Sequence, residues 1–129
     1  MTEKHDLNAI SHPAINEVLA EEVAAADPDD IVIFDQAVLV ESPILGRWGT
    51  GPAEGYQDVI VVETPLETRV ERLVSQRKMD PADARARIAS QVSDEQRRAV
   101  ARWVIANGGG PDDLEAEVRR VWDEITGTA

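Results

Sequence analysis

Three short apolar runs, at residues 31–34, 59–62 and 103–105, constrain the fold of this chain more than any other feature of its sequence. Each run is rich in β-branched residues and apolar almost without interruption, as is typical of strands buried on both faces of a parallel sheet. Helical patterns lie between and around the runs. Because strands and helices alternate along the chain, the sequence predicts an α/β fold with a parallel sheet flanked by helices.

Helices are predicted before the first run and after the last one. Residues 13–26 carry apolar side chains at helical spacing, and the His12-Pro13 pair indicates a turn at the start of this helix. The Gly-Pro-Asp-Asp segment at 110–113 begins the last helix. The buried face of that helix is predicted to consist of Leu114, Val118, Val121, Trp122 and Ile125.

Capping signals predict three further helix starts between the runs. Thr64 precedes a proline and is expected to cap a helix, with Glu67 completing a capping box. Asp80, followed by proline, and Ser93, followed three residues later by glutamine, give signals of the same kind.

The composition excludes several classes of protein. A length of 129 residues favours a single domain, 1–129, with one core. The absence of cysteine rules out disulfides and thiolate metal sites, and the two histidines, His5 and His12, give little support to a zinc site. A net charge of −12 argues against binding to nucleic acid or to an anionic membrane. The lack of a long apolar run or a signal-peptide core predicts a cytoplasmic location.

One part of this acidic chain is basic. Residues 69–103 contain nine basic and five acidic residues, a net charge of +4. Such an island indicates a small polyanionic ligand more than a long polymer. The alternative is an ordinary solvated surface, on which Asp83 pairs with Arg87 and Asp94 with Arg98. Spacing alone favours this second interpretation.

No phosphate-binding loop is recognisable in the sequence. Such a loop needs glycines for close backbone approach and a lysine followed by serine or threonine. The two lysines, Lys4 and Lys78, are followed by His5 and Met79. The glycine-rich stretch 46–55 contains no lysine and is interpreted as an irregular connecting loop. No nucleophile elbow or Ser/His/Asp set is present, so no catalytic or metal-binding residue is predicted.

Six segments form a pattern when they are taken in order. They are LNAISHPAI (7–15), DQAVLVES (35–42), DVIVVETPLETRVERLVSQR (58–77), ARARIASQ (84–91), EQRRAVARWVIANGG (95–109) and LEAEVRRVW (114–122). In this order and spacing they resemble the later two-thirds of dephospho-CoA kinase. The resemblance implies a P-loop kinase-like α/β fold with a lid at about 76–98. It also implies transfer of the γ-phosphate of ATP to the 3′-hydroxyl of dephospho-CoA, the last step of coenzyme A synthesis.

The resemblance implies roles for residues on the ATP side. Arg77 and Arg87 match lid arginines expected near the ATP phosphates, and Gln91 matches the glutamine that closes that motif. Asn107 and Gly108 match a loop that lies against the adenine. Planar, always-charged guanidinium groups suit phosphate recognition better than lysines do. ATP and Mg²⁺ are the cofactors expected for the intact family.

Further residues are implied on the dephospho-CoA side. His12 matches the His-Pro of the substrate-binding portion, and Asp35, Leu39 and Glu41 match a motif at the end of a strand beside dephospho-CoA. Asp35 follows the first apolar run, and α/β sheets place their ligand sites at strand ends. Taken alone, the same aspartate also fits a turn or a helix cap.

The sequence departs from the family pattern in two ways. Arg102 stands where the family usually has aspartate, which puts the geometry before the third run in doubt. The family's N-terminal portion, with a central strand, the phosphate-binding loop and an acidic residue near the attacking hydroxyl, has no counterpart. We therefore expect a sheet without the P-loop strand and a chain that is inactive alone. It could be a fragment completed by a separate chain that supplies the P-loop portion, a non-catalytic nucleotide- or CoA-binding module, or a decayed pseudo-kinase.

Overall fold

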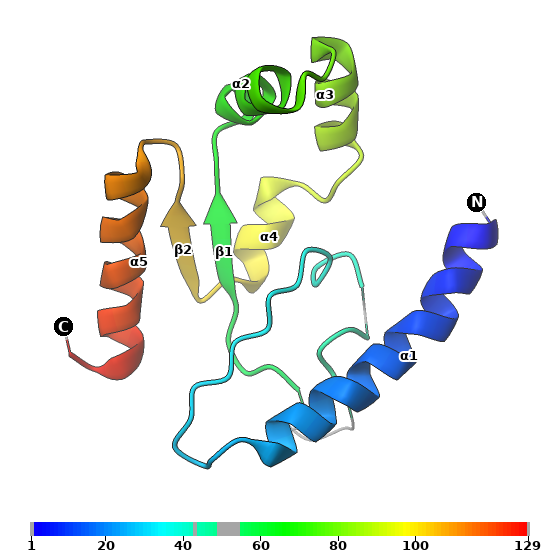
Figure 1. The fold of residues 1–129 in the computed structure, drawn as a ribbon, viewed down its shortest axis with the longest axis vertical. Helices are drawn as coiled ribbons and strands as arrows, with labels where there is room; N and C mark the ends of the chain where they lie inside the picture. Colours follow the sequence, from blue (N-terminus) through cyan, green and yellow to red (C-terminus); the bar gives the residue numbers. More distant parts are fainter. Residues whose placement is uncertain (1, 43, 49–54, 129) are drawn as a thin grey trace. The chain divides into compact units, whose positions relative to one another are not determined.

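Two compact units, Met1–Gln57 and Asp58–Ala129, make up the chain. The computed structural model describes residues 2–42, 44–48 and 55–128. In the described part, the first unit consists of one long helix followed by turns and irregular segments, and the second contains a sheet with helices (Figure 1).

The sheet of the second unit is parallel, as predicted. Strands β1 (Ile60–Glu63) and β2 (Trp103–Ala106) pair side by side and run in the same direction (Figure 1). Both predicted strands are confirmed, with ends that differ by one residue. Val61 and Ile105 are buried and contribute to the core of this unit.

Helices connect and flank the two strands. Between β1 and β2 lie α2 (Leu66–Arg77), α3 (Pro81–Ala89) and α4 (Asp94–Val100), and α5 (Pro111–Thr126) follows β2. α5 packs on β2, α4 contacts β1, and α2 packs against α3. The parallel pairing requires a crossover between the strands, and α2, α3 and α4 supply it.

Two of the predicted helix starts are confirmed by their cap geometry. The carboxylate of Asp80 accepts hydrogen bonds from the backbone N–H groups of Ala82 at 2.8 Å and Asp83 at 3.3 Å. The hydroxyl of Ser93 accepts from the N–H of Gln96 at 3.1 Å, and the Gln96 side chain accepts from the N–H of Ser93 at 2.9 Å. These caps depend on residues within one turn, which is why the sequence predicts them.

The predicted cap of α2 is wrong. Pro65 occupies the cap position, and no side chain caps this helix. The hydroxyl of Thr64 instead donates to the carbonyl of Asn107 at 3.1 Å, and Glu67 pairs with Arg85. Both side chains that were predicted to cap α2 therefore form contacts with residues far along the chain instead.

The predicted buried face of α5 is confirmed only in part. Val121 is buried, and Leu114 and Ile125 are half-buried. Val118 and Trp122 are 47% and 45% exposed. A two-stranded sheet covers a narrow strip of the helix, so the margins of its apolar face stay in contact with solvent.

The first unit begins with a longer helix than predicted. α1 (Thr2–Ala25) contains Pro13 in its interior, so the predicted turn at His12-Pro13 is wrong. Proline removes one i→i−4 hydrogen bond, a local cost that the other turns of a 24-residue helix outweigh. No helix in the described part of the chain is long and apolar enough to cross a membrane.

The predicted strand at 31–34 does not form. This run has no regular secondary structure, and Ile31, Val32 and Ile33 are 49%, 46% and 68% exposed. A strand needs a neighbour that satisfies its backbone N–H and C=O groups. The described part of the first unit contains no strand that could do so. The β-branched composition alone was therefore not sufficient.

The predicted loop at 46–55 is described at its two ends, since residues 49–54 lie outside the described residues. Arg47 and Gly55 form an isolated antiparallel bridge, and the N–H of Tyr56 donates to the carbonyl of Gly46 at 2.9 Å. Gly55 has a φ of 140°, and a Cβ there would collide with the Gly46 carbonyl, so this position requires glycine.

Candidate functional site

Two exposed arginines of the second unit are not neutralised by any described residue. The side chains of Arg77, in the last turn of α2, and Arg87, in the last turn of α3, have no hydrogen-bond or ion-pair partner in the described ranges. The other nine arginines each have at least one partner: Arg47, Arg69, Arg72, Arg85, Arg97, Arg98, Arg102, Arg119 and Arg120. Arg77 and Arg87 are thus open to an anionic ligand.

Arg85, two residues before Arg87, shows the contrast. It donates to both carboxylate oxygens of Glu67, at 2.9 and 2.7 Å, and ties α3 to α2. The hydrogen bond from Arg85 lowers the pKa of Glu67 below its ordinary value. Because the folded-state pKa is lowered, the stabilisation from this pair is present above the ordinary pKa of Glu67. It is lost as the pH falls through the lowered pKa.

The two surface pairs that the sequence suggested, Asp83–Arg87 and Asp94–Arg98, do not form between these described residues. Arg98 instead donates to both carboxylate oxygens of Glu63, at 2.6 and 2.9 Å, at the end of β1. This hydrogen bonding raises the pKa of Arg98. Asp94 accepts from Arg69 of α2 at 2.7 Å. Asp94 also accepts from Arg97 of its own helix at 3.3 Å, an i,i+3 contact. The two predicted i,i+4 pairs are therefore wrong, and Arg98 and Asp94 each join α4 to another element.

Gln91 lies beyond the end of α3 and is exposed. Its side-chain oxygen accepts a hydrogen bond from Arg97 of α4 at 3.3 Å. The structure therefore joins Gln91 to α4, and no hydrogen bond of the described residues joins it to Arg77 or Arg87.

The predicted adenine-side residues follow β2, at the carboxyl edge of the sheet. The N–H of Asn107 donates to the carbonyl of Glu63 at 2.7 Å, which extends the strand pairing by one bond. The carbonyl of Asn107 accepts from the hydroxyl of Thr64 at 3.1 Å and from the guanidinium of Arg72 at 3.0 Å. Gly108 comes next, and α/β sheets gather ligand sites at this edge.

Arg102 lies at the other edge of the sheet. Its guanidinium donates to both oxygens of Asp58, at 3.0 and 2.9 Å, and lies 4.6 Å from the centre of the Trp103 ring. The backbone N–H of Arg102 donates to the carbonyl of Val59 at 2.9 Å. Because these contacts lie at the amino ends of both strands, Arg102 leaves the edge around Asn107 undisturbed.

In the first unit, His12 lies beside Ser42, the residue after Glu41. The Nδ1 atom of His12 and the Oγ atom of Ser42 are 3.0 Å apart. Ser42 Oγ also accepts from the N–H groups of Leu45 at 3.2 Å and Ile44 at 3.4 Å. Which of Nδ1 and Oγ donates in this hydrogen bond depends on the tautomer of the imidazole.

The other predicted residues of the dephospho-CoA side lie in the segment that leads to Ser42. Asp35 and Glu41 are exposed and Leu39 is half-buried. Leu39 and Glu41 lie in a turn at 37–41, and Asp35 lies in the irregular segment before it. Among the described residues, the hydrogen bond that joins His12 to this region is the one with Ser42.

Asn16 is a buried polar residue that the sequence did not reveal. It is 8% exposed and lies one turn after His12 on α1. Its Nδ2 atom donates to the carbonyls of Ile44 at 2.6 Å and Arg47 at 2.7 Å, and its Oδ1 atom accepts from the N–H of Gly46 at 2.9 Å. These contacts hold the 44–47 segment on α1. Because all three partners are backbone groups 28–31 positions away, no local pattern points to them.

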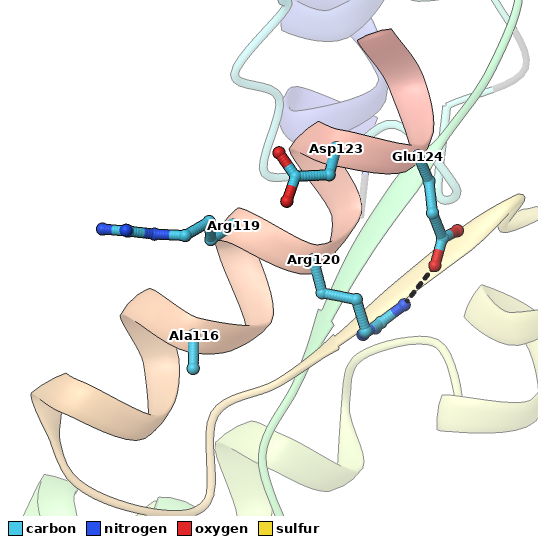
Figure 2. A pocket seen from close by; sticks show the side chains of 5 residues that line it. All are labelled: Ala116, Arg119, Arg120, Asp123 and Glu124. Carbon is cyan, nitrogen blue, oxygen red and sulfur yellow. Dashed lines mark hydrogen bonds and ion pairs between the residues drawn. The ribbon is translucent and has the colours of Figure 1, made fainter. Parts of the chain in front are cut away.

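A shallow groove on α5 contains none of the predicted residues. Its volume is about 410 Å³, and it is lined by Ala116, Arg119, Arg120, Asp123 and Glu124. Figure 2 shows Arg120 directed at Glu124, with which it forms an ion pair of 3.0 Å, and Arg119 pointing away from it. Arg119 pairs with Glu115. A groove on one helix with neutralised arginines is not a candidate site for an anion.

Comparison with known proteins points to one family. A family model described as dephospho-CoA kinase matches residues 1–113. The chain is 43% identical over 119 residues to a dephospho-CoA kinase of Thermobifida fusca, covering 92% of this chain and 56% of that protein. It is 46% identical over 117 residues to a dephospho-CoA kinase of Mycobacterium tuberculosis, covering 91% and 27%.

The fold is similar to a solved structure. The crystal structure of TT1252 from Thermus thermophilus matches with a TM-score of 0.70 and 28% identity, covering 93% of this chain and 58% of that one. The predicted α/β class, with a parallel sheet flanked by helices, is thereby confirmed. The chain spans about half the length of the Thermobifida relative and about a quarter of the mycobacterial one. Since the family model covers most of its residues, the chain belongs to the dephospho-CoA kinase family.

Proposed function

We propose that this chain supplies the lid and the substrate-binding portion of a dephospho-CoA kinase, which phosphorylates the 3′-hydroxyl of dephospho-CoA with ATP. The observation that carries the proposal is the unpartnered state of Arg77 and Arg87 among the described residues. Both lie in the segment that resembles the family's lid. In a chain of net charge −12, acidic partners are abundant, yet these two guanidinium groups have none in the described ranges. Phosphate oxygens would supply strong, charge-assisted acceptors.

The other predicted site residues are assigned to the adenine, to the lid and to the dephospho-CoA side. Asn107 and Gly108 lie beside the adenine, at the carboxyl edge of the sheet. Gln91 closes the lid. The dephospho-CoA side consists of His12, Asp35, Leu39 and Glu41.

The residues present fit the phosphates of ATP but not the rest of the expected machinery. No group of three or more His, Cys, Asp or Glu side chains in the described part could hold Mg²⁺. Neither lysine precedes serine or threonine. Phosphoryl transfer depends on positioning and on charge stabilisation, so the reaction requires a P-loop segment that these 129 residues do not contain. Without such a segment, the same arginines support a second function, a non-catalytic nucleotide- or CoA-binding module.

Calorimetry with ATP tests the role of the two arginines. The double variant Arg77→Ala/Arg87→Ala is expected to bind ATP at least about tenfold more weakly, because each charge-assisted hydrogen bond contributes about 1.5–3 kcal/mol. Wild-type binding should also weaken as salt is raised. Equal binding by wild type and the double variant would mean that the arginines are only a solvated surface.

A matched control separates this effect from the loss of charge. Arg102→Ala/Arg119→Ala also removes two exposed arginines, but both are ion-paired, with Asp58 and Glu115. This control is expected to bind ATP like the wild type. A loss of affinity as large as that of the Arg77/Arg87 double variant would show that only the net charge matters.

A further inference from the structure

Three consecutive glycines, at 108–110, connect β2 to α5 and by themselves leave this segment free to adopt many conformations. Close packing explains two of them. A Cβ on Gly108 would lie 3.1 Å from Cδ of Pro65, and a Cβ on Gly109 would collide with the carboxylate of Asp113. Because glycine leaves the backbone flexible, contacts from outside the segment contribute to fixing its conformation.

One side chain reaches both ends of the segment. Nη1 of Arg72 donates to the carbonyl of Asn107 at 3.0 Å, and Nη2 donates to the carbonyl of Gly109 at 3.2 Å. The planar, rigid fork of the guanidinium group fixes the separation of these two carbonyls. Thr64 adds a second donor to the Asn107 carbonyl at 3.1 Å, whereas Arg72 is the side-chain donor to the carbonyl of Gly109 among the described residues.

The charge of Arg72 is not engaged elsewhere. It forms no ion pair with a described carboxylate, unlike Arg69 on the same helix, which pairs with Asp94. Its partners among the described residues are backbone carbonyls 35 and 37 positions away. A solvated or ion-paired arginine would not select two carbonyls of one glycine-rich segment.

We propose that Arg72 is a positioning residue that holds the backbone at 107–109 in one preformed conformation facing the adenine of the nucleotide. This inference rests on the proposed function, in which Asn107 and Gly108 lie beside the adenine. Arg72 acts through the backbone carbonyls of the segment. Preforming a binding surface saves the ordering cost that a mobile segment would incur on binding.

Backbone ¹⁵N relaxation of the 129-residue chain tests the positioning directly. The N–H order parameters of Gly108 and Gly109 are expected to be about 0.85 in the wild type and below about 0.6 in Arg72→Ala. Arg72→Lys keeps the charge but lacks the fork, so it should not restore order. Order parameters that stay at the wild-type value in Arg72→Ala would overturn the proposal.

Two controls define the cause. Arg119→Ala removes an arginine that pairs with Glu115 on α5 and should leave the glycine order parameters unchanged. Thr64→Val removes the other donor to the Asn107 carbonyl and should leave Gly109 ordered, since Arg72 still holds its carbonyl. Loss of order at Gly109 in Thr64→Val but not in Arg72→Ala would contradict the assignment.

Binding of ATP and of tripolyphosphate tests whether the 107–109 segment contacts the adenine base. Arg72→Ala is expected to bind ATP about tenfold more weakly, because two or more residues must be ordered on binding, and to bind inorganic tripolyphosphate like the wild type. Equal loss for both ligands, or loss for neither, would overturn the link to adenine. If the wild type itself binds no ATP, the proposed function fails and the adenine role fails with it. The order parameters then still report whether Arg72 fixes the segment.

Discussion

An N-terminal segment of a homologous dephospho-CoA kinase, made separately and mixed with this chain, is expected to produce ATP-dependent phosphorylation of dephospho-CoA that the chain alone does not show. The 129 residues contain no lysine followed by serine or threonine. Loss of a single well-placed electrostatic donor already lowers kcat by roughly 10²–10³. The loss of a whole phosphate-binding loop should therefore place the activity of the chain alone below detection.

The structure gives reasons for the segment to bind. β1 pairs with β2 on one side and has no strand on its other side in the described part of its unit. In the first unit, Ile31, Val32 and Ile33 are exposed and unpaired. Open strand edges are templates for an added strand. A segment that binds only the folded chain should raise its melting temperature, with about 2.7 kcal/mol of stabilisation at a concentration of 100 times Kd.

Coenzyme A formation and melting temperature are measured together as the segment is titrated. A segment whose loop lysine is replaced by alanine should still raise the melting temperature but give no coenzyme A, which separates assembly from catalysis. If neither quantity changes at about a hundredfold excess of the intact segment, the split-kinase hypothesis is rejected. Turnover by the chain alone within about tenfold of a full-length homologue would show that the loop is not needed.

Asn16→Ala is expected to lower the free energy of unfolding of the first unit by about 2–4 kcal/mol. Asn16 is 8% exposed, and its truncation leaves the carbonyl of Arg47 and the N–H of Gly46 without the partner that Asn16 supplies. The carbonyl of Ile44 keeps only the backbone N–H of Arg47. Urea titration followed by hydrogen exchange of peptides covering 38–48 measures the loss. In Asn16→Ala, the amides of this region are expected to exchange faster than in the wild type, while exchange in β1 and β2 stays unchanged.

Two further variants sharpen this test. Asn16→Asp keeps an acceptor for the N–H of Gly46 but turns a carboxylate oxygen toward two carbonyls, so it should destabilise the unit at least as much as alanine. Glu17→Ala removes an exposed side chain from the adjacent position on α1 and should change stability by less than about 0.5 kcal/mol. If Glu17→Ala lowered the free energy of unfolding as much as Asn16→Ala, the hydrogen bonds of Asn16 would contribute nothing specific.

Local chemistry was readable from the sequence wherever both partners lie within a few residues. The caps at Asp80 and Ser93 formed as predicted because donor and acceptor belong to the same turn. The runs at 59–62 and 103–105 became strands because each had the other as a partner. The family resemblance also singled out Arg77 and Arg87 as the residues that would face phosphates.

Tertiary structure decided the features that depend on a distant partner. The run at 31–34 has the composition of a strand, but it pairs with no strand among the described residues. High β propensity alone does not supply hydrogen-bond partners. The hydroxyl of Thr64 donates to the carbonyl of Asn107 instead of capping its helix. Arg98 donates to the carboxylate of Glu63 instead of pairing with Asp94.

The same reason explains why the sequence did not reveal the contacts of Arg72 and Asn16. Arg72 and Asn16 bind backbone groups 28–37 positions away, and every residue carries such groups, so no residue type marks the target. The sequence alone determined the fold class and the helix starts at Asp80 and Ser93, and it proposed Arg77 and Arg87 as lid arginines. Only the tertiary structure decided which arginines stay unpaired among the described residues and which side chains hold the backbone around them, because those outcomes depend on which groups the folded chain brings within hydrogen-bonding distance.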